Sequence, residues 1–182
     1  MPRLFTGIEI PEPVGQALSL LRGGLPGARW LEPDRYHVTL RFIGDIDVRT
    51  ADEIVDRLAR VRRPAFSVAL EGLDSFGSRK PHAIVARATS SQALDELQAE
   101  HERIMQRIGL PPEGRRFTPH VTLARLRGTS VREVAEYLGL RGGFTTAAFP
   151  VERFVLFSAR AMTGGGPYLV EDAYPLALAG AR

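Results

Sequence analysis

The tetrapeptide His-Val-Thr-Leu occurs twice in this chain, beginning at His37 and at His120. The chain of 182 residues has only four histidines, so half of them open a copy of the same motif. Each copy lies in an apolar, β-prone stretch, which predicts a strand. Because side chains alternate between the faces of a strand, each motif predicts a histidine and a threonine on one face and two apolar side chains packed inward.

The elements predicted around the two copies follow the same order. The first half reads as strand 4–10, helix 11–24, strand 36–44, helix 49–61 and strand 65–76. The second half reads as strand 82–89, helix 91–109, strand 116–126, helix 131–139 and strand 149–160. Agreement at five successive elements indicates an internal duplication.

Capping signals mark the helix that follows each motif. Thr50 and Glu53 have the spacing of a capping box, and so do Ser130 and Glu133. The sequence therefore predicts a helix that begins near each of these pairs.

We predict an α+β fold of two pseudo-symmetric α/β lobes, each an antiparallel-rich sheet with two helices, around a central cleft lined by the HVTL strands. Residues 1–182 form a single domain, with lobe-forming repeats at about 3–77 and 82–160 and a C-terminal hairpin at about 161–179. Gly164 to Gly166 fit a turn in that hairpin. A phosphate-binding loop is the alternative, but no helix pattern follows whose N-terminus could bind an anion.

Composition restricts the class of protein. Cysteine is absent, which excludes disulfides and thiolate chemistry and suits a reducing cytoplasm. No apolar run approaches the roughly 18 residues that span a bilayer, and the N-terminal segment does not resemble a signal peptide. We expect a cytoplasmic protein that does not bind membranes; the oligomeric state stays open, with a monomer as the expectation. The formal charge of +3 rests almost entirely on arginine, which indicates either a nucleic-acid ligand or coding bias.

Two histidines that flank one point suit acid/base catalysis. Histidine titrates near neutral pH, so a neutral ring can accept a proton while a charged partner donates one. Threonine hydroxyls can donate to anionic oxygens. In-line attack at phosphorus needs a base, an acid on the opposite side and such donors between them, so the constellation predicts phosphoester chemistry without a metal.

Other chemistries fit the sequence poorly. Zinc sites use three or four ligands, and the motif histidines lack a third His, a Cys or an H-E-x-x-H helix. Ser158 lacks a nucleophile-elbow context, and neither a P-loop nor a dinucleotide-binding glycine motif follows a strand. We expect no metal and no cofactor. His82, at the start of a strand, and His101, on the apolar side of a helix, are interpreted as structural.

The motifs and their context carry a family resemblance. Paired H-x-T-x motifs are the hallmark of the two-histidine phosphoesterase superfamily. The segments RLFTGIEIPEPV, YHVTLRFIGD preceded by Trp30, RRFTPHVTLAR and FVLFSAR with GPYLV resemble the RNA 2′,3′-cyclic phosphodiesterases within it, formerly called 2′-5′ RNA ligases. The resemblance implies metal-independent hydrolysis of a terminal 2′,3′-cyclic phosphate on RNA to a 2′-phosphate.

The resemblance also implies roles for the motif residues. His37 would donate a proton to the departing 3′ oxygen, and His120 would be the base that activates water. Thr39 and Thr122 would hold the phosphate oxygens. The near-symmetry of the two halves does not by itself distinguish the acid from the base.

Residues beyond the motifs extend the predicted substrate site. Arg125 matches a basic position of the family, but alternation places it on the face opposite His120, so it reaches the phosphate only if the strand bulges after Leu123. Arg41 falls on the His37 face by alternation and is a second candidate for binding phosphate; a solvated surface position is the alternative for both arginines. Phe42 and Tyr36 could stack a base or belong to the core and strand surface.

Two alternative functions stay open at the level of sequence. One is a phosphodiesterase for small cyclic nucleotides or 2′-5′ oligoadenylates, which would use the same four motif residues. The other is a non-catalytic nucleotide-binding module. Both histidines and both threonines are present, which argues against a decayed site.

Overall fold

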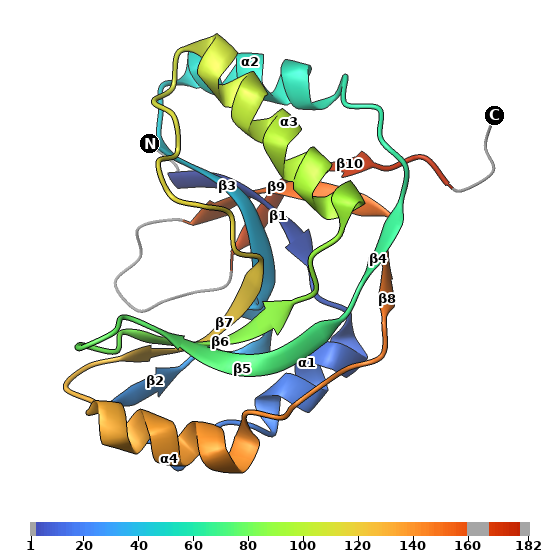
Figure 1. Ribbon diagram of the computed structural model, residues 1–182. Coiled ribbons are helices and arrows are strands. Elements are labelled where there is room, and N and C mark those ends of the chain that lie inside the picture. The colour runs from blue at the N-terminus through green and yellow to red at the C-terminus, as the bar shows by residue number, and fades with distance from the viewer. Residues whose placement is uncertain (1–2, 160–167, 179–182) are drawn as a thin grey trace.

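The computed structural model describes residues 3–159 and 168–178 (Figure 1). The first half of the chain forms β1 (Arg3–Glu9), α1 (Glu12–Ser19), β2 (Ala28–Trp30), the 3-10 turn η1 (Pro33–Arg35), β3 (His37–Asp45), α2 (Val48–Leu58), β4 (Phe66–Val68) and β5 (Leu70–Phe76). The second half forms β6 (Ala83–Ala88), α3 (Gln92–Ile108), β7 (His120–Leu126), α4 (Val131–Arg141), β8 (Phe149–Val151), β9 (Arg153–Ala159) and β10 (Leu169–Pro175).

The two HVTL strands lie at the centre of the main sheet. The strand order is β10-β9-β1-β3-β7-β6-β5, with neighbours antiparallel, and β2 pairs with β7 on the side of β3. The central strands β3 and β7 meet through one residue pair, Val38 and Val121. The sheet therefore consists of two halves that join at the HVTL strands.

Each half of the sheet belongs to one lobe (Figure 1). The upper lobe contains β1, β3, β9 and β10 with helices α2 and α3, and the lower lobe contains β2, β5, β6 and β7 with helices α1 and α4. Outward from the β3–β7 junction, β1 and β9 on one side correspond to β6 and β5 on the other, and β10 is an additional edge strand of the upper lobe. The predicted α+β fold with two pseudo-symmetric lobes and two helices on each is confirmed.

Each sequence repeat, however, contributes to both lobes. Helix α1 and strand β5 of the first repeat lie in the lower lobe, while α3 and β9 of the second repeat lie in the upper lobe. The chain crosses between the lobes at β4 and β8, which pair with each other at the right of Figure 1. We expected each repeat to form its own lobe, and the structure differs because the order of elements specifies which strands form and not which neighbours they take. The repeat boundaries themselves stay a prediction.

Helix starts follow the sequence with one correction. Ser130 and Glu133 form the predicted capping box at the start of α4. The predicted box of Thr50 and Glu53 is wrong, because α2 begins at Val48 and its N-cap is Asp47. The Asp47 side chain accepts a hydrogen bond from the backbone N–H of Thr50, and aspartate is among the best N-cap residues.

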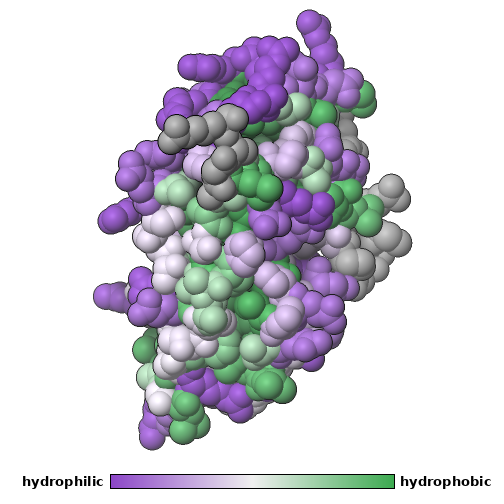
Figure 2. Space-filling view, turned by 90° about the vertical axis from the view of Figure 1, so that its right-hand side faces the viewer, coloured by the Kyte–Doolittle hydropathy of each residue, from purple (hydrophilic) through white to green (hydrophobic). Residues whose placement is uncertain are grey.

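The core buries the predicted apolar positions. The valine and leucine of both HVTL motifs are buried, as are the apolar faces of α2 and α3. From the side of β4 and β8, hydrophilic residues gather at the end that carries α2 and α3, above a paler, partly hydrophobic band (Figure 2). No helix in the described part of the chain is long and apolar enough to span a membrane.

The C-terminal strand β10 completes the edge of the upper lobe. It pairs antiparallel with β9, and its Tyr174 packs against Phe154. The turn predicted at Gly164 to Gly166 lies outside the described residues.

Candidate active site

The β3–β7 junction brings the two motifs together. Val38 of one motif lies directly opposite Val121 of the other, and the strands are antiparallel. Continuing this register places the histidine of each motif opposite the threonine of the other. Since the valines are buried, alternation turns both histidines and both threonines toward the opposite face, and all four side chains are half-buried.

Backbone carbonyls fix the orientation of both imidazole rings. Nδ1–H of His37 donates to the carbonyl oxygen of Arg35 at 2.8 Å, and Nδ1–H of His120 donates to that of Thr118 at 2.6 Å. A carbonyl can only accept, so Nδ1 carries hydrogen and Nε2 is the atom free for proton transfer. Nε2 of His37 lies 2.9 Å from the hydroxyl of Thr39.

Aromatic rings surround His37. The ring centroids lie 4.8 Å away for Phe5, 5.1 Å for Tyr168 and 5.6 Å for Phe157. His120 has an edge contact with Phe76 at 4.7 Å. The ring of His37 is therefore packed against aromatic side chains that limit its contact with water.

This environment shifts the titration of both rings. Burial lowers the pKa of His37 to about 4, and the hydrogen bond to the Arg35 carbonyl offsets part of that effect. The charges of His120 and Arg125 lower the pKa of His37 further. Burial, followed by the charge of Arg125, also holds the pKa of His120 below its ordinary value. Both rings are therefore mainly neutral at pH 7 in the free protein, and Arg125 acts on both.

Arg125 is brought to this face by a β-bulge. The register between β6 and β7 shifts by one residue at Leu123. This is the position at which the sequence predicts a bulge if Arg125 is to reach the site. Leu123 and Ala124 are consequently both buried, and Arg125 is exposed on the side of His120.

Strand β3 bulges at the equivalent leucine, and this moves Arg41 away from the site. The register between β1 and β3 shifts at Leu40, so Leu40 and Arg41 are both buried. The guanidinium of Arg41 pairs with Glu102 of α3 and donates to the carbonyl oxygens of Phe42 and Pro111. The expectation that Arg41 shares the His37 face is wrong, because the bulge reverses the alternation.

The same bulge turns Phe42 outward. Phe42 is 47% exposed and takes the position that Arg125 has on β7. Tyr36, the other predicted stacking residue, is buried in the core.

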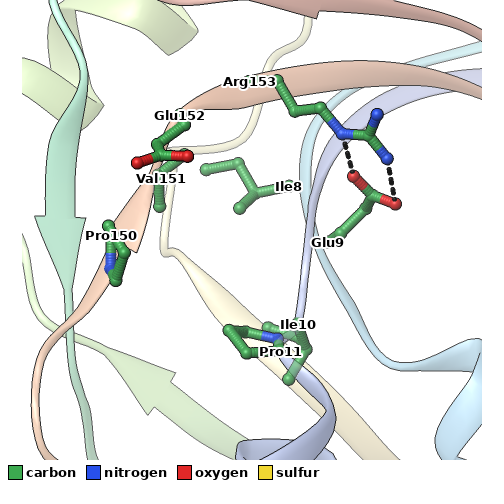
Figure 3. A pocket seen from close by; sticks show the side chains of 8 residues that line it. All are labelled: Ile8, Glu9, Ile10, Pro11, Pro150, Val151, Glu152 and Arg153. Atoms are coloured by element: carbon green, nitrogen blue, oxygen red, sulfur yellow. Dashed lines mark hydrogen bonds and ion pairs between the residues drawn. The ribbon is translucent and has the colours of Figure 1, made fainter. Parts of the chain in front are cut away.

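Neighbouring strands add charged groups that the sequence reasoning missed. Glu9 of β1 lies opposite His37 and forms two hydrogen bonds with Arg153, of 2.7 and 2.9 Å (Figure 3). A cavity of about 330 Å³, lined by residues 8–11 and 150–153, adjoins this pair (Figure 3). On the other lobe, Arg87 of β6 lies opposite His120 and pairs with Asp74 at 3.5 Å. Only the strand pairing, which is not visible in the sequence, identifies these neighbours.

The remaining histidines lie apart from the motif face. His101 is fully buried on α3, where its Nδ1 and the hydroxyl of Thr6 are 2.8 Å apart. His82 is exposed immediately before β6. Within residues 3–159 and 168–178, no group of three or more His, Cys, Asp or Glu side chains could hold a metal ion.

Known proteins of one family resemble this chain in sequence. A family model described as LigT like Phosphoesterase matches the chain twice, over residues 8–86 and 85–168, and each match contains one HVTL motif. An RNA 2′,3′-cyclic phosphodiesterase of Aeropyrum pernix is 38% identical over 112 residues, which cover 60% of this chain and 63% of that protein. A protein of the same name from Thermus thermophilus is 29% identical over 96% of this chain and 90% of its own length.

Solved structures show the same fold. The crystal structure of E. coli LigT in apo form aligns with a TM-score of 0.80 at 21% identity, over 97% of this chain and 98% of that one. The paired motifs, the pseudo-symmetric lobes and the two successive family matches lead to one conclusion. This chain belongs to the LigT-like phosphoesterase family.

Proposed function

We propose that the protein is an RNA 2′,3′-cyclic phosphodiesterase that hydrolyses a terminal 2′,3′-cyclic phosphate to a 2′-phosphate without a metal. The observation that carries this proposal is the pairing of Val38 with Val121, which turns two His-Thr pairs toward one face. Relatives named RNA 2′,3′-cyclic phosphodiesterase support the substrate class. E. coli LigT, whose fold this chain shares, has been crystallised with 3′-AMP and with phosphate.

His120 acts as the base and His37 as the acid. Nε2 of His120 takes a proton from water as the water oxygen bonds to phosphorus. The bond between phosphorus and O3′ breaks, and Nε2–H of His37 gives its proton to O3′. The phosphate stays on O2′, and proton exchange with solvent resets the two rings.

His37 must take up from solvent the proton that it donates, and binding of the phosphate favours this uptake. Burial and the charge of Arg125 keep His37 neutral in the free protein. A phosphodiester anion beside the ring favours the imidazolium and raises the pKa of His37.

Thr39, Thr122 and Arg125 stabilise the phosphate. The hydroxyl of Thr39, now 2.9 Å from Nε2 of His37, can turn its hydrogen to a phosphate oxygen when that ring is protonated. The exposed guanidinium of Arg125 has the fork geometry that matches phosphate oxygens. These groups face the charge that grows on the oxygens during attack. Phe42, exposed on the His37 face, is placed to stack the terminal base.

The decisive experiment uses an oligoribonucleotide with a 2′,3′-cyclic phosphate end in the presence of EDTA. We expect hydrolysis that EDTA does not inhibit, and phosphatase treatment combined with mass spectrometry should place the product phosphate on O2′. Inhibition by EDTA that zinc reverses would contradict the metal-free mechanism.

Two further outcomes of the same assay separate the alternatives. Turnover of small cyclic nucleotides or 2′-5′ oligoadenylates with no turnover of the RNA end would identify the rival phosphodiesterase. Tight binding of the RNA end without any turnover would identify a binding module.

A further inference from the structure

Two arginines face each other beside the candidate active site. Arg29 of β2 lies directly opposite Arg125 of β7, and both side chains are exposed. Neither makes an ion pair within the described part of the chain. Like charges directly opposite on neighbouring strands are destabilising, so the pair has no role in holding the sheet together.

The positive charge continues away from the histidines. Arg127 follows Arg125 by two residues and is exposed. Backbone hydrogen bonds from Leu126 to His82 (2.9 Å) and from Arg127 to Gly27 (3.0 Å) hold three segments side by side, residues 26–30, 77–82 and 124–130. These segments lie at the left of the lower lobe in Figure 1.

The three segments contain basic residues and no acidic ones. Their exposed basic residues, which we call the basic surface, are Arg29, Arg79, Lys80, Arg125 and Arg127.

The acidic residues closest in sequence to these segments are already engaged. Glu32 pairs with Arg22 at 3.2 Å and Asp74 pairs with Arg87 at 3.5 Å. Glu133 caps helix α4. The charge of the basic surface is therefore not neutralised by its neighbours in the chain.

The equivalent end of the other HVTL strand carries charges of both signs, because Asp45 lies opposite Arg3 and Arg49 follows Asp47. Strand β3 ends at Asp45, and Asp47 follows it, where β7 ends beside Arg127. The basic surface thus leads away from the paired motifs in one direction only, along β7 and β2.

We propose that the basic surface binds the phosphodiesters of the RNA strand that precedes the cyclic phosphate. This proposal rests on the proposed function and specifies the substrate of the same site. The terminal phosphate lies between the motif histidines, and the preceding nucleotides run along β7 toward the β5–β6 turn. The protein consequently acts on the 3′ ends of RNA chains in preference to 2′,3′-cyclic mononucleotides.

The test compares two substrates and two matched double variants. The variant Arg29→Ala/Arg127→Ala removes two charges of the basic surface. The control Arg103→Ala/Arg107→Ala removes two exposed arginines of α3, in the other lobe. Each protein is assayed for kcat/KM on a cyclic-phosphate-ended oligoribonucleotide and on a 2′,3′-cyclic mononucleotide, over a range of salt concentrations.

We expect the basic-surface variant to lose on the order of 10-fold or more in kcat/KM on the oligonucleotide at low salt and to retain wild-type activity on the mononucleotide. The slope of log(kcat/KM) against log[salt] should fall in magnitude by about 0.7 for each lost phosphate contact. The control variant should match the wild type on both substrates. Equal losses on both substrates, or a loss shared by the control, would overturn the proposal.

Direct binding separates this proposal from the proposed function. Fluorescence anisotropy with a labelled single-stranded oligoribonucleotide reports on the basic surface even if the wild type opens neither cyclic substrate. Weaker binding by the basic-surface variant alone would support the RNA path in that case. Equal binding by all three proteins would refute it.

Discussion

The two HVTL strands share a backbone conformation and carry different side chains. Both bulge at the motif leucine, and both orient the histidine through a carbonyl two residues earlier. Beyond the bulge, β3 presents Phe42 where β7 presents Arg125. Across the sheet, His37 has Glu9 as its neighbour and His120 has Arg87. The open face is therefore largely aromatic around one histidine and basic around the other.

On the buried side of the sheet, the polar groups lie in the lobe of His37 and the apolar ones in the lobe of His120. In the upper lobe, Arg41 lies opposite Thr6, which contacts His101, and all three side chains are buried polar groups. In the lower lobe, the equivalent pair is Ala124 and Ile84, both fully buried. At these equivalent positions the core of the upper lobe holds polar groups, and the core of the lower lobe holds apolar ones.

A pseudo-symmetric frame can thus support an asymmetric reaction. The pseudo-symmetric strands place two chemically identical rings on one face. Their surroundings lower the pKa of each ring through partly different groups: burial with the charges of His120 and Arg125 act at His37, and burial with the charge of Arg125 acts at His120.

The largest expected effect comes from removing either ring. His37→Ala and His120→Ala should each reduce kcat by about 10²-fold or more, because each removes one of the two proton-transfer groups. Thr39→Ala and Thr122→Ala should cost less. His82→Ala, which removes an exposed histidine, is the matched control.

A substrate with a better leaving group tests the assignment of roles. It should partly restore the activity of His37→Ala and not that of His120→Ala, because a better leaving group departs without being protonated and the attacking water must still lose a proton. Rescue of His120→Ala instead would reverse the acid and base. A near wild-type kcat in either histidine variant would contradict the paired-histidine mechanism.

The polar core of the upper lobe should depend on Arg41. Arg41→Met leaves the Glu102 carboxylate, whose side chain is only 18% exposed, without its guanidinium partner. We expect the free energy of unfolding in urea to fall by about 3 kcal/mol, and the double variant Arg41→Met/Glu102→Gln to recover most of it. The control Arg103→Met, on the exposed side of α3, should change it by less than about 0.5 kcal/mol. An Arg41→Met protein as stable as the control would show that the ion pair contributes nothing.

The free energy of unfolding should fall at acid pH because of a buried histidine in the upper lobe. Burial lowers the pKa of His101 to about 3, so His101 becomes protonated at a much lower pH in the folded state than in the unfolded chain. The stabilisation from neutral His101 is complete above the unfolded pKa and is lost as pH falls toward the folded value. Between pH 7.5 and 5 this amounts to about 2 kcal/mol. Urea unfolding of His101→Gln across this range should show a shallower pH dependence, and an unchanged slope would exclude His101 as its source.

The smallest effect concerns the residues beyond the two bulges. Arg125→Ala removes a charge that lowers the pKa of both motif histidines, so both limbs of the kcat/KM profile should move to higher pH. The maximum should also fall, because a phosphate ligand is lost. Phe42→Ala, at the equivalent position of β3, should leave the limbs in place. Limbs that stay fixed or move to lower pH in Arg125→Ala would contradict the electrostatic role.

Local patterns in the sequence predicted much of this structure. Alternation identified the buried valines and leucines of the motifs, and the spacing of Ser130 and Glu133 predicted the capping box of α4. These features depend on residues close together in the chain, so their physical causes are visible there.

Pairing between distant strands was not predictable. Arg41 was assigned to the wrong face because the bulge at Leu40 arises in the register with β1. Glu9 and Arg87 gain their positions beside the histidines only through pairing across the sheet. The exchange of β5 and β9 between lobes likewise depends on which sheet edges meet, and the sequence does not encode that in any local pattern.

Strand pairing in the upper lobe joins segments that are far apart in the chain. Strand β1 can pair with β3 early in synthesis, but its other neighbour, β9, begins only at Arg153. Contacts so distant in sequence raise the contact order and slow folding. A ribosome-bound chain that ends before β9 leaves one edge of β1 open, and open strand edges invite aggregation. A fragment with one HVTL motif would therefore be an incomplete sheet, and the two motifs can share a face only once the chain extends through β7, which ends at Leu126.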